Sequence, residues 1–94
     1  MGAGGIPNKS VKISTERSLK ITGTPNSRVD KYKEGKKIQS RWYDNFGRAV
    51  RNRDYEHQNA HDNHFFPHDY SWVWQGDKGK RGKEPIPPDY DNYN

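Results

Sequence analysis

The chain has 94 residues, enough for one small domain with a thin core. Hydrophobic residues make up 28% of it and aromatic residues 13%, so much of the available burial must come from rings. The absence of cysteine excludes a disulfide framework and thiolate zinc sites, and no apolar run is long enough for a transmembrane span or a signal peptide.

The net charge of +5 favours polyanionic partners such as nucleic acid, and this charge is unevenly distributed. Residues 28–55 carry 9 Lys or Arg against 4 acids, whereas residues 56–75 carry no Lys or Arg and 3 acids. An acidic block therefore follows directly on the most basic part of the chain.

Residues 1–27 are predicted to form a flexible N-terminal arm with a weak strand or helix. The arm opens with a glycine-rich stretch and ends in a cluster of turn-forming residues, Gly23-Thr-Pro-Asn-Ser27. Between them, apolar residues alternate with polar ones only in two short pieces, around Val11 and around Leu19.

Residues 28–55 predict a three-stranded antiparallel meander. Three runs favour strands, Arg28–Lys33, Ile38–Tyr43 and Ala49–Tyr55, and turn signals at Glu34-Gly35 and Asp44–Gly47 separate them, with a positive φ expected at Gly47. Tyr70-Ser-Trp-Val-Trp74 adds a short fourth strand. The expected fold is mainly β or small α+β, with residues 28–75 as its core and residues 76–94 as a flexible basic and proline-rich tail.

Alternation along the second run places Gln39, Arg41 and Tyr43 on one face and Ile38, Ser40 and Trp42 on the other. We expect one face that mixes arginine with tyrosine and one more apolar face. Guanidinium groups bind phosphate bidentately and stack on rings, so the first face is a candidate nucleic-acid surface. The residues assigned to this binding are Arg28, Arg51, Arg53, Tyr43 and Tyr55.

All four histidines lie within twelve residues, at His57, His61, His64 and His68. Three interpretations fit this cluster. Histidine titrates near neutral pH, so two rings can serve as base and acid in RNA cleavage by the ribose 2′-OH, with an arginine stabilising the phosphate and neighbouring acids orienting the rings. The four rings can instead bind a metal such as zinc, although Asn59, Asp62, Asn63 and Pro67 disfavour the helix that would align them. They can also be purely structural.

A spaced pattern of residues resembles the C-terminal toxin domains of bacterial polymorphic toxins. It consists of Gly23-Thr-Pro-Asn-Ser27, Asp30-x-Tyr32, Arg41-Trp-Tyr-Asp44-x2-Gly47-x3-Arg51-x2-Asp54-x2-His57 and His64-Phe-Phe-Pro-His68-Asp69-x2-Trp72. These domains end Rhs-type and LXG-type secreted proteins and some prophage-encoded chains. The resemblance covers about residues 23–74 and implies an RNase toxin that a cognate immunity protein neutralises. It also implies that the toxin acts in the cytoplasm of a target cell, after delivery as part of a larger secreted protein. It implies that Arg41, Asp54, His57, His64 and His68 form the site, while His61 lies outside the pattern.

The sequence therefore predicts a metal-independent endoribonuclease with no cofactor, catalytic residues His57, His64, His68, Arg41 and Asp54, RNA as its partner and no membrane association. The first alternative is a non-catalytic nucleic-acid-binding or phage accessory module. The second is a zinc-binding nuclease with His57, His61, His64 and His68 as ligands.

Overall fold

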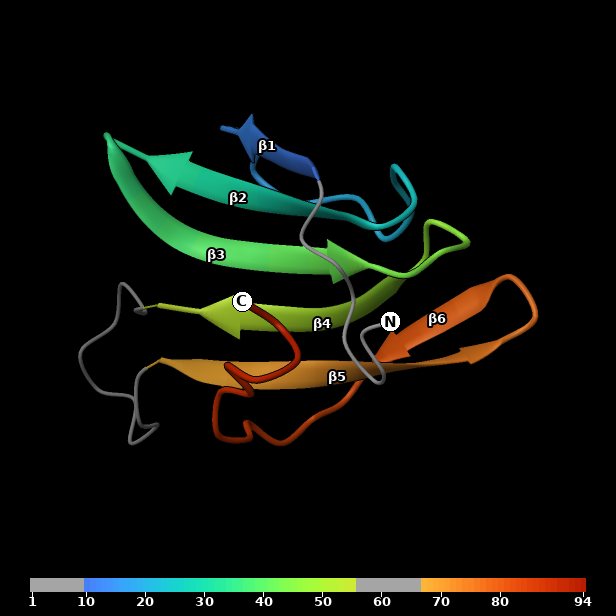
Figure 1. The fold of residues 1–94 in the computed structure, drawn as a ribbon. Helices are drawn as coiled ribbons and strands as arrows, with labels where there is room; N and C mark the ends of the chain where they lie inside the picture. The colour runs from blue at the N-terminus through green and yellow to red at the C-terminus, as the bar shows by residue number, and fades with distance from the viewer. Residues whose placement is uncertain (1–9, 56–66) are drawn as a thin grey trace.

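The computed structural model describes residues 10–55 and 67–94 of the chain, and its described part is all β (Figure 1). Six strands form one sheet whose spatial order follows the chain order. The strands are β1 (Ser10–Ser14), β2 (Ser27–Lys33), β3 (Lys36–Tyr43), β4 (Ala49–Asp54), β5 (His68–Gln75) and β6 (Lys78–Arg81). Among these residues no helix could cross a membrane.

The mainly β prediction is confirmed, but the predicted number of three to four strands is too low. β1 pairs with β2 in parallel, and all later neighbours pair antiparallel, so the sheet is mixed. The α+β alternative is wrong for residues 10–27, which contain β1 and no helix. β1 coincides with the alternation around Val11 that allowed a weak strand in the arm. β6 is short and without apolar side chains, and it is ordered by pairing with the longer β5, so alternation does not reveal it.

The two predicted turns of the meander are confirmed. Glu34 and Gly35 have φ values of 52° and 78°, the positive pair that a tight hairpin needs. Gly47 has a φ of 78°, and the Asp44 carboxylate closes that turn by accepting the N–H groups of Phe46 and Arg48 at 2.8 and 2.9 Å.

Residues 19–27, part of the predicted arm, are hydrogen-bonded to the turn between β3 and β4. The N–H groups of Gly23 and Asn26 donate to the carbonyls of Gly47 and Asp44 at 2.8 and 2.9 Å. A Cβ atom at Gly47 would lie 2.3 Å from the Gly23 carbonyl oxygen, so this close contact requires glycine. Leu19, at the start of the segment, is one of the few buried aliphatic residues.

The register across β3, β4 and β5 decides which side chains share a face of the sheet. One face, here called the Asp54 face, carries the row Gln39–Asp54–His68 and the row Arg41–Asn52–Tyr70. The other, the Asp69 face, carries the rows Ser40–Arg53–Asp69 and Trp42–Arg51–Ser71. The expected division into one arginine face and one apolar face is wrong, because Arg41 lies on one face while Arg51 and Arg53 lie on the other.

The C-terminal segment, residues 82–94, crosses the Asp69 face (Figure 1). Ile86 forms a β-bridge with Asp69, and the ring of Tyr93 meets Trp42 edge to face at 5.8 Å between centroids. The sequence predicts a flexible tail for residues 76–94, and in the structure this stretch contains β6 and the segment that covers Trp42, which is only 1% exposed.

Candidate functional site

Asp54 and His68 form a cross-strand pair where β4 ends and β5 begins. They are register partners, and His68 Nε2 lies 3.5 Å from Asp54 Oδ2. Gln39 on β3 donates its side-chain amide to Asp54 Oδ1 at 3.1 Å, and the His68 ring packs edge-on against Tyr70 at 5.2 Å. Side chains on both sides thus hold the pair, with His68 buried. A carboxylate beside an imidazole orients the ring.

Arg41 occupies the next row of the same face. Its Nε donates to Asn52 Oδ1 at 2.7 Å, its Nη1 donates to the carbonyl of Leu19 at 2.7 Å, and its guanidinium lies 5.1 Å from the centre of the Trp72 ring. The side chain is buried, and desolvation lowers its pKa, with the nearby charge of Arg81 as a smaller cause in the same direction. Arg41 therefore places a desolvated positive charge within the sheet face.

The pairing of β3, β4 and β5 brings together three residues predicted from the sequence as catalytic. Asp54 and His68 share a row, and Arg41 lies in the adjacent row, two residues along β3 from the partner of Asp54. Adjacent rows on one face are about 7 Å apart along the strands. An imidazole, a carboxylate and a guanidinium are therefore close neighbours on one face of the sheet, where the imidazole and the guanidinium are buried.

The Asp69 face holds two of the predicted nucleic-acid contacts in a buried ion cluster. Asp69, fully buried, accepts hydrogen bonds from Arg53 Nε at 2.7 Å, Arg53 Nη2 at 3.0 Å and Arg51 Nε at 2.9 Å. Arg53 lies between the rings of Trp42 and Tyr90, at 4.9 and 4.4 Å from their centres. Asp69 is one of the acids next to the histidines in the sequence, and in the structure it binds these two arginines on the face opposite His68 and orients no described histidine.

The other predicted nucleic-acid contacts are also bound within the fold. Arg28 forms an ion pair with Asp30 at 3.0 Å, and the hydroxyl of Tyr55 lies 3.0 Å from that of Ser40. The Tyr43 hydroxyl donates to the carbonyl of Lys20, and burial raises its pKa. The interior, poor in aliphatic side chains, is built largely from these polar networks.

His57, His61 and His64 lie outside the described residues. Within residues 10–55 and 67–94, no group of three or more histidines and acids is placed to hold a metal ion. Three of the four ligands of the predicted zinc alternative are thus not described, and the metal-free and zinc chemistries both remain predictions from the sequence.

Several residues of the Asp54 face are not indicated by the sequence. Asn52 joins the networks by accepting from both Arg41 and the Trp72 indole, the latter at 3.1 Å, and the Arg81 guanidinium on β6 stacks over Tyr70 at 4.1 Å. The register between strands places these side chains. Alternation would have put Tyr70 beside His68, but only the pairing of β5 with β6 brings Arg81 above it.

Comparison of the chain with protein-family models, with curated proteins and with solved structures finds no match. The assignment of a function therefore rests on the residues and geometry described above.

Proposed function

We propose that this chain is a metal-independent endoribonuclease, a toxin domain of the polymorphic class that an immunity protein neutralises. The observation that carries the proposal is the grouping of Arg41, Asp54 and His68 in adjacent rows of one sheet face. The resemblance of the sequence selected these three residues, and the strand register brings them together.

In the proposed reaction a base removes the proton of a ribose 2′-OH, and the 2′ oxygen attacks the adjacent phosphorus. The bond to the 5′ oxygen breaks, and an acid protonates that leaving group. His68 supplies one of these two functions, with Asp54 orienting its ring, and the sequence assigns the other to His57 or His64. Arg41 supplies positive charge for the phosphorane, which is negatively charged relative to the ground state.

The direct test is cleavage of total RNA in EDTA by the wild-type chain and by His68→Gln and Asp54→Asn. We expect cleavage by the wild type and a fall in kcat/KM of about 100-fold or more for His68→Gln, the usual contribution of a positioned acid or base. Both substitutions keep the side-chain size, and circular dichroism with urea denaturation verifies the fold.

Asp91→Asn is the matched control for Asp54→Asn, because it removes the same charge from an exposed residue of the C-terminal segment. It should cleave RNA at the wild-type rate. Intact RNA after incubation with concentrated wild-type protein, or a folded His68→Gln variant within twofold of wild type, would contradict the proposal. Growth arrest of bacteria that express the wild type, and not His68→Gln, would support the toxin assignment.

The second candidate is a non-catalytic nucleic-acid-binding module, favoured by the burial of His68 and Arg41, of which 0% and 7% are exposed. In such a module both side chains serve the fold. It predicts that His68→Gln lowers stability but leaves RNA affinity unchanged, and that no variant or wild-type sample cleaves RNA.

A further inference from the structure

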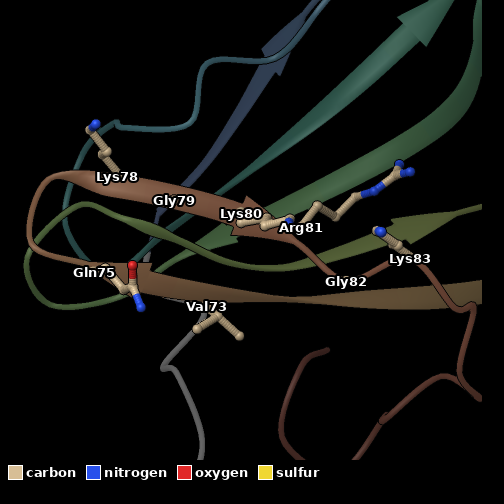
Figure 2. A pocket seen from close by; sticks show the side chains of 8 residues that line it. All are labelled: Val73, Gln75, Lys78, Gly79, Lys80, Arg81, Gly82 and Lys83. Carbon is tan, nitrogen blue, oxygen red and sulfur yellow. The ribbon is translucent and has the colours of Figure 1, made fainter.

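A basic groove lies beside the hairpin of β5 and β6 (Figure 2). Lys78 to Lys83 line it together with Val73 and Gln75 of β5, and it has a volume of about 450 Å³. The chain beyond β6 is held along β5 because the Gly82 N–H donates to the Ser71 carbonyl at 2.8 Å. We call this feature the β5–β6 groove.

The cations of this groove are exposed and not neutralised by the described protein. Lys78, Lys80 and Lys83 form no ion pair with any described residue, and no acidic side chain lines the groove. By contrast, Arg28, Arg48, Arg51 and Arg53 all pair with aspartates. The groove is therefore one region of the described surface where Lys and Arg side chains without an acidic partner gather, and no acid lines it.

The spacing of the lysines suits an extended chain of negative charges. Lys78 and Lys80 stand opposite Gln75 and Val73, so they share one face of β6 and lie about 6 to 7 Å apart. Successive phosphates along a nucleic-acid strand have a similar spacing. Lysine binds phosphate as a point charge without a fixed orientation, which fits contact with a backbone and not with one base.

Arg81 connects the groove to the Asp54 face. It lines the groove, yet its guanidinium stacks over Tyr70 at 4.1 Å, and the Tyr70 ring lies 5.2 Å from that of His68. Lys78 and Lys80 lie on the Asp69 face, whereas Arg81 stands opposite Trp72 on the Asp54 face. Arg81 on the edge strand β6 is therefore the point at which the groove adjoins the Asp54 face.

We propose that the β5–β6 groove binds the phosphate backbone of single-stranded RNA and holds the substrate while an adjacent linkage reaches Arg81 and the Asp54–His68 pair. The inference deepens the proposed function and rests on it for the identity of the strand as RNA. A single strand is selected because in-line attack by a 2′-OH needs a nucleotide free of helical stacking, and because a positively charged groove is the feature with which proteins follow the backbone of a single strand.

Binding is measured with a fluorescent 2′-deoxy dodecamer, which cannot be cleaved because it lacks the attacking hydroxyl. The variant Lys78→Gln/Lys80→Gln/Lys83→Gln is compared with a control of equal charge, Lys12→Gln/Lys20→Gln/Lys33→Gln, whose lysines are exposed elsewhere. We expect the groove variant to lose at least tenfold in affinity at low salt. The slope of log affinity against log salt should fall by about 2, since each phosphate contact on a single strand contributes about 0.7.

The control triple should stay within twofold of wild type, and both variants should unfold at the wild-type urea concentration. Equal losses in the two triples would mean that net charge alone attracts the strand, and this would overturn the groove. Polyglutamate and an unlabelled oligonucleotide are also compared as competitors of the fluorescent dodecamer. If both displace it at the same concentration of negative charge, the nucleic-acid assignment is overturned in favour of an acidic protein surface.

Cleavage separates the groove from the proposed nuclease. The groove variant should lower kcat/KM for an RNA dodecamer and leave it unchanged for a dinucleotide, which is too short to span groove and site. If the groove variant loses dodecamer binding while the wild type cleaves no RNA, the groove is supported and the nuclease proposal is wrong. If the wild type cleaves RNA while the groove variant binds the dodecamer as tightly as the wild type, the nuclease is supported and the groove proposal is wrong.

Discussion

Asp69 is the residue on which the buried ion cluster depends. It is fully buried, accepts hydrogen bonds from Arg51 and Arg53, and also accepts the N–H of Asp89 at 3.1 Å from the C-terminal segment. One carboxylate therefore joins β4, β5 and the segment that crosses them. Its loss would leave the largely buried charge of Arg53 without a counterion.

Replacement Asp69→Asn is expected to lower the free energy of unfolding by about 3 to 5 kcal/mol, the usual effect of removing one partner from a buried ion pair. Urea denaturation followed by tryptophan fluorescence measures the change. Asp77→Asn, at the exposed turn between β5 and β6, removes the same charge and should change stability by less than about 0.5 kcal/mol. A loss below about 1 kcal/mol in Asp69→Asn would show that the cluster is not the centre of the fold.

At the scale of the element, the β5–β6 hairpin depends on one glycine. Gly79 pairs with Trp74, and a Cβ atom at Gly79 would lie 2.6 Å from Cζ2 of that indole. The ring is fixed because its Nε1 donates to the Ala49 carbonyl at 2.7 Å. The strand that carries Lys78 and Lys80 therefore stays against β5 only with no side chain at position 79.

Gly79→Ala should destabilise the chain by about 1 to 3 kcal/mol, because either the indole or β6 has to move. The free energy of unfolding in urea measures the loss, and a change in the tryptophan emission of the folded state reports the displaced ring. Lys80→Ala, in the same strand, should leave both within error of wild type. Wild-type stability in Gly79→Ala would contradict the close packing of β6 on Trp74.

At the scale of the whole molecule, much of the interior consists of aromatic rings with polar ends. Burial raises the pKa values of Tyr43 and Tyr93, in both cases as the largest cause. A tyrosine whose pKa is higher in the folded than in the unfolded chain contributes stability below the unfolded value, near 10, and this stability is lost as the pH rises through the folded value.

The chain is therefore expected to lose stability above about pH 10, the range in which free tyrosine ionises. Urea midpoints at pH 8 and pH 11 measure the loss. Tyr93→Phe keeps the ring on Arg51 and Trp42 but removes one ionisation, so it should lose less stability across this interval than the wild type. An equal loss in both proteins would contradict the role of Tyr93.

The sequence predicts β2, β3 and β4 because two turns have a chemical signature, Glu34-Gly35 and the Asp44–Gly47 turn. It predicts correctly that Arg41 and Trp42 point to opposite faces. It does not predict that Arg41 shares its face with Asn52, because a bulge near Trp42 and the register of β4 set that pairing.

The candidate site was predictable only in part, because it also depends on the register between strands. Alternation cannot show that Asp54 stands opposite His68, since the strand pairing that joins them bridges residues 55–67. The burial of Arg53 and Asp69 was also beyond the sequence, because the covering residues Ile86, Asp89 and Tyr93 come from a stretch whose composition is typical of a flexible tail.

The strand order of the sheet repeats the chain order, which allows the strands to pair in the order of their synthesis. Each strand from β2 to β6 finds its partner in the strand made just before it, so pairing can proceed while the chain grows. The contact of Tyr93 with Trp42 is different, because it joins the third strand to a residue made long after it. A nascent chain therefore carries a Trp42 without its Tyr93 cover until Tyr93 has been added.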